Sequence, residues 1–376
     1  MIQPTSPSVK TDNIRDILVI GGGIAGISAA ARLSADASVT VLEMESSIGH
    51  HATGRSAAIM IRNYGNATLR ALNAASYGFL QEPIGVADTS LLSPRGELLL
   101  ADDAALPSLS AYLEGSVGLE RLTAKQAVEL VPILRPEKIA SAIIEWDAQD
   151  IDVDRMLQGF ARMLRKNDGT IVSSAKVTAI SRENGVWKVS TSKGDYSAPI
   201  LINAAGGWAD PVAKMAGVAP VGIQPLRRSA ALIPMPAEYD ISRWPLFGDV
   251  AESWYAKPES GKLMVSPADE DPVDPHDVWA EDMVLAEGLD RFEQAVTVSV
   301  TRVDHSWAGM RSFAPDKTLV VGFAPNTDGF FWLAGQGGYG IQTAAAVSEL
   351  VADLCLGRKP KLAAEVVAAL DPGRFG

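Results

Sequence analysis

The stretch DILVIGGGIAGISAAARLSADASVTVLE, residues 16–43, decides the fold of this chain. Asp16–Ile20 is apolar after its first residue and predicts a short buried strand. An Ala-rich segment to about Ser34 predicts a helix, and Val39–Leu42 predicts a second strand. A strand, a glycine-rich turn, a helix and a second strand in this order predict a βαβ unit of a parallel sheet.

The turn carries the dinucleotide fingerprint Gly-x-Gly-x-x-Gly at Gly21, Gly23 and Gly26. The first glycine permits a sharp turn, the second lets the backbone approach a pyrophosphate, and the third lets helix and strand pack closely. The helix start adds free N–H groups and the positive end of a dipole. Glu43 can accept both hydroxyls of an adenosine ribose and would repel a 2′-phosphate. A dinucleotide site is therefore predicted, with a βαβ unit that binds no ligand as the alternative.

The bulk properties are those of a globular enzyme. The chain has 376 residues, 47% hydrophobic and 21% charged, which is enough for two domains. A net charge of −12 argues against nucleic acid as a partner. The single cysteine, Cys355, excludes a disulfide within the chain and fits a cytoplasmic protein.

Other classes are disfavoured by the distribution of residues. No apolar run is long enough to span a bilayer, and the four histidines show no metal-ligand spacing, so no metal is expected. Residues 1–13 are polar and lack an apolar core, which predicts a flexible leader. The acidic, proline-containing loop Asp269–Asp277 is predicted to be solvated surface.

A second glycine-rich segment follows a predicted strand near the C-terminus. Gly335, Gly337 and Gly340 repeat the Gly-x-Gly-x-x-Gly spacing and open a helix that runs to about Leu356. No strand ending in an acid follows, so a second dinucleotide site is rejected. The better interpretation is a helix N-terminus aimed at a group that can become negative.

Together these segments resemble a known family, the D-amino-acid oxidase group of FAD-dependent oxidoreductases. Within that group the chain looks most like the D-arginine dehydrogenase and D-amino-acid dehydrogenase branch. The resemblance runs from about Asp16 to about Leu356. It is carried by the βαβ fingerprint and by His51–Ala58, Asn203–Gly206, Trp307–Phe313 and Gly335–Gln342.

The resemblance implies an α/β fold: a Rossmann-like, glutathione-reductase-like FAD-binding domain with an inserted α+β substrate domain on a mixed or antiparallel sheet. The FAD-binding domain would comprise residues 14–85, 148–218 and 314–376. The substrate domain would comprise residues 86–147 and 219–313.

The resemblance also implies the cofactor contacts. Glu43 would hold the adenosine ribose, Val177 would lie near the adenine, and the segment after Gly335 would lie at the pyrimidine end of the flavin. The residues expected at the FAD site are Gly21, Gly23, Ile24, Ala25, Gly26, Glu43, Met44, His51, Thr53, Arg55, Ser56, Ala57, Val177, Ala205, Gly206, Trp208, Arg311, Gly337, Gly338, Tyr339, Gly340, Ile341 and Gln342.

By the same resemblance, Arg228 and Arg311 would bind the α-carboxylate of the substrate, with Tyr255 assisting. Gly338 would offer its carbonyl to the substrate amine, and Gln342 would line the same edge. An ordinary structural ion pair is the alternative for Arg311. The neighbouring Arg227 is expected to point to the other face of its strand.

Two further residues complete the implied substrate site. Tyr64 would belong to a mobile lid, and Glu97 would meet a cationic substrate side chain; an exposed strand glutamate is the alternative for Glu97. The chain departs from the branch at Ile59, Ile61 and Gly96, where the branch carries histidine, threonine and proline. These departures put arginine itself in doubt as the substrate.

The reaction implied is FAD-dependent oxidative deamination of a D-amino acid, with basic side chains favoured, by hydride transfer from Cα to flavin N5. The imino acid would hydrolyse to a 2-oxo acid and ammonia, and electrons would pass to an unknown acceptor, such as a quinone or an electron-transfer protein. One alternative is an FAD amine oxidase acting on glycine, sarcosine or an opine-type N-substituted amino acid. A redox-silent FAD-binding subunit is another.

Overall fold

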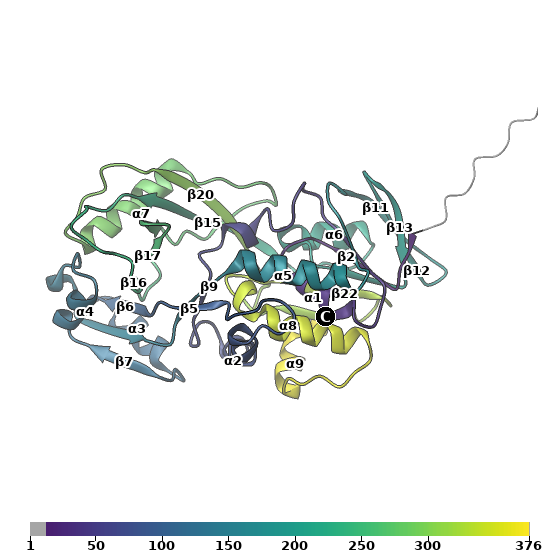
Figure 1. Cartoon of the computed structure of the whole chain (residues 1–376), viewed down its shortest axis with the longest axis horizontal. Helices are drawn as coiled ribbons and strands as arrows, with labels where there is room; N and C mark the ends of the chain where they lie inside the picture. The colour runs from purple at the N-terminus through teal and green to yellow at the C-terminus, as the bar shows by residue number, and fades with distance from the viewer. Residues whose placement is uncertain (1–12, 376) are drawn as a thin grey trace, which may run out of the picture.

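The computed structural model describes residues 13–375 and has two parts, joined by long strands (Figure 1). The leader predicted for residues 1–13 lies outside the described residues except for Asn13. Asn13 belongs to β1 (Asn13–Ile14), which pairs with Tyr196 and Ser197 of β13 (Gly194–Ala198).

A mainly parallel sheet forms the first part. The strands β2 and β3 are buried along their whole length, as expected for a sheet covered on both faces. Parallel pairing runs through the sheet except between its last two strands, which are antiparallel. The order is β10 (Thr170–Val172), β3 (Val39–Leu42), β2 (Ile17–Ile20), β14 (Ile200–Asn203), β22 (Phe330–Ala334), β21 (Val320–Phe323).

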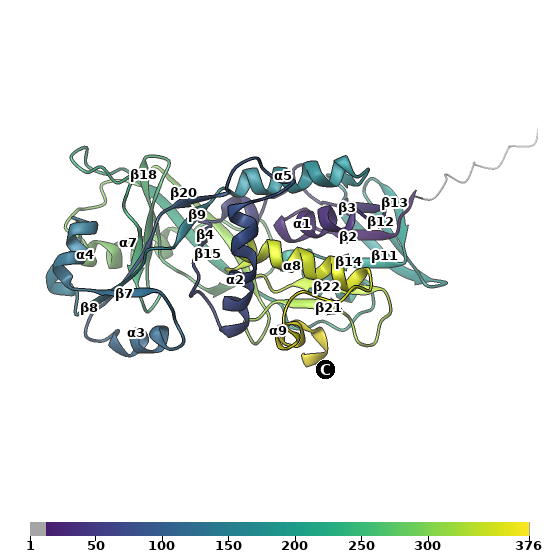
Figure 2. The same cartoon turned by 60° about the horizontal axis from the view of Figure 1, so that its bottom comes forward.

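Helices from both ends of the chain cover one face of this sheet. The helix α1 (Ile24–Leu33) packs against α8 (Gly340–Cys355) and α5 (Val153–Lys166), so purple and yellow ribbons lie side by side in Figure 2. Three alanines of α1, Ala29, Ala30 and Ala31, are buried, and such small side chains let the helices approach closely. The helix α2 (Ala67–Gln81) packs on α8.

The opposite face is covered by α6 (Ala209–Met215) and an antiparallel meander, whose strands are β11 (Val177–Glu183), β12 (Val186–Thr191) and β13. The period-two pattern of residues 170–198 predicts one meander that also includes Thr170–Ser173, but β10 pairs with β3 in the parallel sheet instead. Alternating residues alone could not distinguish a short edge strand of one sheet from a strand of the next.

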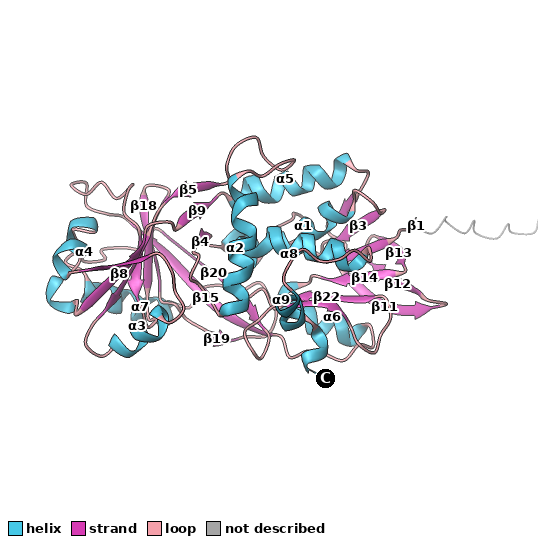
Figure 3. Cartoon of the chain, turned by 90° about the horizontal axis from the view of Figure 1, so that it is seen from below, coloured by secondary structure: helices cyan, strands magenta, loops and turns pink. Residues whose placement is uncertain are grey.

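A mixed sheet forms the second part. The strands β6 and β16 are parallel, whereas the remaining pairs are antiparallel. Its strands are β19 (Asp271–Pro272), β15 (Gln224–Ile233), β18 (Lys262–Ser266), β17 (Tyr255–Glu259), β16 (Leu246–Asp249), β6 (Glu97–Ala101), β8 (Ser141–Glu145) and β7 (Leu119–Leu122), with β20 (His305–Phe313) on β15. The helices α3 (Leu106–Leu113), α4 (Ala124–Leu130) and α7 (Asp282–Ala295) surround it (Figure 3).

The predicted fold class is confirmed: a Rossmann-like α/β part carries a second part built on a mixed sheet. A small sheet of β4 (Ile59–Met60), β9 (Gln149–Ile151) and β5 (Leu92–Pro94) crosses the predicted division, since β5 lies in the segment assigned to the substrate domain. The helix α9 (Ala364–Leu370) follows α8. None of the helices within residues 13–375 has the length and apolar character needed to cross a bilayer.

Candidate functional site

A cavity of about 670 Å³ lies where the parallel sheet meets β15 and β20. Residues that end or follow β2, β3 and β14 line it, as do residues at the start of α8. In open parallel sheets, ligands bind outside the carboxyl ends of the strands. The cavity is therefore at the expected place for a dinucleotide.

The glycines of the first turn are required by the backbone geometry. Gly21 has φ +111°, and a Cβ there would lie 2.3 Å from the carbonyl oxygen of Ala204. A Cβ at Gly26 would lie 2.0 Å from the carbonyl oxygen of Gly21. Gly26 thus packs behind the turn, and the other two fingerprint glycines line the cavity.

Backbone amides orient the carboxylate of Glu43. Its two oxygens accept from the amides of Gly22, at 2.6 Å, and Glu45, at 2.8 Å, and the residue is 7% exposed. The Thr53 hydroxyl accepts from the Ile24 amide at 3.0 Å. The Ile24 N–H, one of the donors at the start of α1, is therefore already occupied.

Most of the predicted cofactor residues line this one cavity, although they come from distant segments. The exceptions are Gly26, Tyr339 and Gln342. The predicted residues that line it are Gly21, Gly23, Ile24, Ala25, Glu43, Met44, His51, Thr53, Arg55, Ser56, Ala57, Val177, Ala205, Gly206, Trp208, Arg311, Gly337, Gly338, Gly340 and Ile341.

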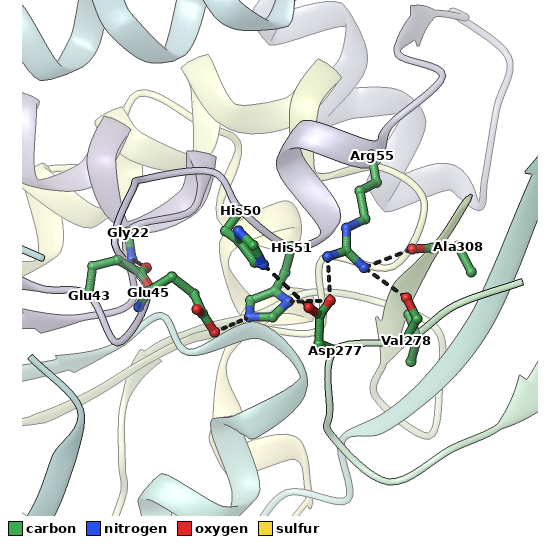
Figure 4. A network of polar contacts seen from close by, with 9 residues as sticks. All are labelled: Gly22, Glu43, Glu45, His50, His51, Arg55, Asp277, Val278 and Ala308. Carbon is green, nitrogen blue, oxygen red and sulfur yellow. Dashed lines mark hydrogen bonds and ion pairs between the residues drawn. The ribbon is translucent and has the colours of Figure 1, made fainter. Parts of the chain in front are cut away.

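A polar network ties the 3-10 turn Ala52–Arg55 to the second part of the molecule (Figure 4). The Arg55 guanidinium donates to the carbonyls of Val278, at 2.9 Å, and Ala308, at 3.0 Å, and pairs with Asp277. That hydrogen bond lowers the pKa of the Asp277 carboxyl. These groups engage both Nη atoms of the Arg55 guanidinium, although the residue still lines the cavity as expected.

Two histidines join the same network. His51 Nε2 lies 3.0 Å from Glu45 Oε1, and His50 Nε2 lies 3.5 Å from Asp277 Oδ2 (Figure 4). Among residues 13–375, Glu45, His50 and His51 bring metal-ligand atom types within 4.8 Å of one another, a grouping the sequence did not reveal. The two carboxylates already serve the histidines as hydrogen-bond or ion-pair partners.

The prediction that Asp269–Asp277 is solvated surface holds for most of the segment, since Asp271, Asp274 and Asp277 are exposed, but it fails at Asp269. We call residues 268–278 the acidic strap. The side chain of Asp269 is 5% exposed, and it accepts from the Ser229 amide at 2.6 Å and pairs with Arg227 at 3.2 Å. Two strap residues, Pro275 and His276, line the cavity. The strap therefore crosses the site from the second sheet to the histidine network.

The two arginines predicted for the substrate carboxylate lie on one face of neighbouring strands. In the β15–β20 pair, Leu226 stands opposite Arg311, and Arg228 is two residues further along β15. Side chains two residues apart share a face, so Arg228 and Arg311 are diagonal neighbours. Both line the cavity, and so does Tyr255. Arg227 does not line the cavity, as the alternation predicted.

The partners of the two arginines differ. Arg228 donates through Nη2 to Glu270 Oε1 at 2.8 Å, while its buried Nε has no hydrogen-bond partner among residues 13–375. Arg311 donates through Nη1 to the Tyr64 hydroxyl at 3.2 Å. Within the described part of the chain, no carboxylate lies within ion-pair distance of Arg311. Arg311 thus presents positive charge to the cavity without a carboxylate partner, whereas Glu270 partly neutralises Arg228.

The tyrosines respond to this charge. Burial raises the pKa of Tyr255, but the guanidinium groups of Arg311 and Arg228 lower it more, so the net shift is downward. For Tyr64 burial outweighs the effect of Arg311, and the pKa is raised. The pKa values of the two phenols are therefore shifted in opposite directions.

A second cavity, of about 530 Å³, adjoins the first across the arginine pair. Tyr64 and Glu270, which bond to the two arginines, line it, as do Glu252 and Tyr339. Tyr64 and Tyr339 pack with ring centroids 4.9 Å apart. Of the site residues predicted from the sequence, Tyr64 and Tyr339 line this second cavity and not the first.

Glu97 lines neither cavity. It is 6% exposed and accepts from the Tyr112 hydroxyl at 3.1 Å. Burial, with a further contribution from the Glu145 carboxylate, raises the pKa of Glu97 to about 8. A protonated, enclosed carboxyl does not attract a cation, so the structure does not support the contact predicted between Glu97 and a cationic side chain.

The last two predicted substrate-site residues, Gly338 and Gln342, lie near the start of α8 and make different contacts. Gly338 is in close contact with Arg311 and Tyr64, since a Cβ there would lie 3.1 Å from both Arg311 Nη1 and the Tyr64 hydroxyl. Gln342 is buried and accepts from the Ile61 amide at 3.1 Å, so it holds the segment before Tyr64 in place of lining the pocket.

Comparison with known proteins places these features in a family. A family model described as "DAO: FAD dependent oxidoreductase" matches residues 16–354. Human mitochondrial dimethylglycine dehydrogenase is 23% identical over 99% of this chain. The alignment covers 46% of that enzyme, so the chain spans less than half of its length.

Solved structures share the fold. L-proline dehydrogenase from P. horikoshii superposes with a TM-score of 0.83 at 23% identity, over 97% of this chain and 98% of that chain. Glycine oxidase from Geobacillus kaustophilus gives a TM-score of 0.82 at 19% identity, over 96% and 98% of the two chains. At these identities the likeness shows a common architecture over nearly the whole length of both proteins.

Proposed function

Because the chain belongs to the DAO family of FAD dependent oxidoreductases, we propose that it oxidises a small amine that also carries a carboxylate. FAD is the cofactor. The substrate amine loses two electrons and two protons to become an imine, which water hydrolyses. A D-arginine-specific activity is not the main proposal, since neither the family match nor the similar proteins point to it.

The first cavity fits FAD. Glu43 would hold the adenosine ribose, because two backbone amides fix its carboxylate at the edge of the cavity. The turn at Gly21–Gly23 would hold the pyrophosphate, since a side chain at Gly21 would strike Ala204. When bound, FAD supplies the acceptor for the two electrons of the C–H bond. Gly337–Ile341, at the start of α8, would favour negative charge on the reduced ring.

One observation carries the carboxylate part of the proposal. Arg311 faces the cavity with no carboxylate within ion-pair distance among residues 13–375, and Arg228 stands beside it on the same face. Two guanidinium groups in one pocket are costly unless an anion compensates them. A substrate carboxylate would do so, and two-point pairing would fix which hydrogen on the adjacent carbon is exposed to the acceptor.

Tyr255 and Gly338 would complete the orientation. Tyr255 lines the cavity beside the arginine pair, so its hydroxyl would donate to the bound carboxylate. Gly338 lies against Arg311, which leaves its carbonyl as an acceptor for the amine. Neither residue needs to move a proton in this scheme, because the substrate can enter with its amine neutral.

The similar proteins favour a glycine-like substrate. Their names specify dimethylglycine, glycine and L-proline, in each of which an amine stands next to a carboxylate. Glycine, sarcosine and other N-substituted glycines are therefore the first candidates. A D-amino acid with a basic side chain is the second candidate, and the acids Glu252 and Glu270 of the second cavity favour it.

Anaerobic mixing with a substrate panel tests the proposal. The holoenzyme would be mixed with glycine, sarcosine, N,N-dimethylglycine, L-proline, D-arginine and D-lysine, and the loss of oxidised-flavin absorbance would be followed. We expect rapid bleaching with at least one N-substituted glycine or amino acid. A flavin that remains oxidised with every amine would overturn the proposal and favour a redox-silent FAD-binding subunit.

A further inference from the structure

The ligand that Arg228 holds in this structure is a side chain of the protein itself. Glu270 Oε1 lies 2.8 Å from Arg228 Nη2. Arg228 is 8% exposed, and its buried Nε has no hydrogen-bond partner among the described residues. A carboxylate therefore already occupies part of the guanidinium that the proposed function assigns to the substrate carboxylate.

The acidic strap is anchored on both sides of Glu270. Before it, Asp269 accepts from the amide and the hydroxyl of Ser229, at 2.6 and 2.9 Å. After it, Asp271 pairs with Arg227 at 2.6 Å, and Asp277 pairs with Arg55. These contacts do not involve the Glu270 side chain. The backbone of the strap can keep its place while that side chain moves.

Glu270 itself is held less firmly than its neighbours. Its side chain is 34% exposed, and its second ion pair, with Lys317, is 3.6 Å long, with the lysine side chain 62% exposed. It lines the second cavity, which gives the carboxylate space to swing into. A half-exposed carboxylate on a fixed strap is suited to exchange between a buried arginine and solvent.

We propose that Glu270 is a specificity-determining residue, an internal carboxylate that occupies Arg228 in the empty site and gives way to the carboxylate of an incoming ligand. This inference rests on the proposed function of the arginine pair. Arg311, which has no such competitor in the described chain, would receive the ligand first. The ligand would then replace Glu270 on Arg228.

The exchange also discriminates by charge. The displaced carboxylate stays at the second cavity, where Glu252 is already present, so a bound ligand faces two acids beyond the arginine pair. A ligand with one carboxylate and an amine tolerates these acids, whereas a second carboxylate is repelled. The site is therefore tuned to amino acids and against dicarboxylates.

The variant Glu270→Gln tests the exchange, with acetate and malonate as ligands that have no amine to oxidise. Each would be titrated into the holoenzyme while the flavin spectrum is recorded. In the wild type we expect acetate to bind more tightly than malonate. In E270Q both should bind more tightly, acetate by about tenfold and malonate by more, as expected for removal of a carboxylate that competes for Arg228.

Asp274→Asn is the matched control. Asp274 is an exposed acid of the same strap, and its side chain makes no hydrogen bond or ion pair within residues 13–375. The substitution D274N removes the same negative charge as E270Q, so a general electrostatic effect would appear in both variants. FAD content and the thermal unfolding midpoint of each variant would verify that it folds.

Two results would overturn the inference, and they are distinguishable. If acetate and malonate bind the wild type but E270Q binds them no better than D274N does, the exchange is wrong and the arginine pair remains the carboxylate site. If neither ligand perturbs the flavin of the wild type or of E270Q, the assignment of the arginine pair fails too, and the proposed function loses its main support.

Discussion

A guanidinium that faces a cavity without a carboxylate partner is the most informative single group in this protein. Arg311 has this position among residues 13–375, and its hydrogen bond goes to a neutral phenol, Tyr64. Burial alone would lower the pKa of Arg311, but Tyr64, Tyr255 and Glu252 raise it, so the charge is permanent. The site is therefore prepared for an anion at every pH at which the protein is folded.

Arg311→Met should reduce kcat/KM by roughly 100-fold or more, because a charge-assisted, two-point contact with the substrate is lost. Arg311→Lys should recover only part of this loss, since an ammonium keeps the charge but not the planar fork. Steady-state kinetics with the best substrate of the panel would measure both. Arg121→Met, on the exposed strand β7, is the control. Equal effects of R311M and R121M would contradict the assignment.

Glu97→Gln should affect stability in a pH-dependent way. The pKa of Glu97 is raised to about 8 from its ordinary 4.5, chiefly by burial. The folded protein therefore binds an extra proton between these values, and its stability falls as pH rises through this window. Glutamine cannot ionise, so E97Q should become more stable than the wild type by on the order of 4 kcal/mol at pH 9.

Urea unfolding of E97Q and the wild type at pH 5, 7 and 9 would test this expectation. The difference in the free energy of unfolding should be small at pH 5 and should grow with pH. A difference that stays constant from pH 5 to pH 9 would show that Glu97 keeps its ordinary pKa. Substrate selectivity should not change in E97Q, because the residue lines neither cavity.

The sequence predicted residue types at the site better than it predicted their partners. Arg228 and Arg311 were found because their motifs are local, and strand alternation separates Arg228 from Arg227. Glu97 was misjudged because its surroundings, Tyr112 and Glu145, come from other elements. Burial of an acid depends on tertiary packing, which a short motif around that acid cannot reveal.

At the level of elements, the βαβ unit was predictable because its signals are contiguous. Each of its two strands and its helix has a local sequence pattern, and these patterns agree with the observed β2, α1 and β3. The acidic strap was not predictable, because its acids are explained only by arginines 40 or more residues away, such as Arg55 and Arg227. An acidic loop without its partners reads as ordinary surface.

Gly26→Ala should disrupt the packing of α1 on β2. The added Cβ would lie 2.0 Å from the Gly21 carbonyl oxygen, so the helix would have to shift and the turn would open. We expect loss of most of the bound FAD and a destabilisation of about 2 kcal/mol or more, as for other overpacked sites. Flavin absorbance per chain and thermal unfolding would measure the two effects.

Gly78→Ala is the matched control for this substitution. Gly78 lies in α2, and a Cβ there meets nothing within 4 Å. Alanine should therefore stabilise the helix by about 0.5–1 kcal/mol without any change in FAD content. If G26A retains its flavin as well as G78A does, the close approach at Gly26 is not needed for the cofactor site.

At the level of the whole molecule, the strap spans both parts of the protein beside the first cavity. At one end of the strap, Asp277 pairs with Arg55, which belongs to the part that contains the parallel sheet. At the other end, Asp269 accepts a hydrogen bond from Ser229 of β15 in the mixed sheet. The pKa of Asp277 is lowered by the hydrogen bond from Arg55. The contact is thus fully formed above about pH 4 and is lost only as pH falls through that lowered pKa.

Asp277→Asn should loosen this end of the strap at neutral pH. Amide hydrogen exchange in residues 268–278 should become faster by about two- to fivefold, because an exposed ion pair stabilises a segment only modestly. Mass spectrometry of peptides from the strap would measure the rates. Asp274→Asn should leave them unchanged. Exchange in D277N at the wild-type rate would show that the carbonyl contacts of Arg55 hold the strap without Asp277.

The packing of α8 against α1 has a consequence for how the protein is made. The first cavity is lined by residues from Ile20 to Ile341, so its two walls are translated nearly a whole chain length apart. Until α8 has been synthesised, the face of α1 that α8 covers is open, and the wall of the cavity that the start of α8 forms is missing. On the proposed assignment of this cavity to FAD, cofactor loading would follow synthesis of this helix, and free cofactor would not rescue chains that stall before it.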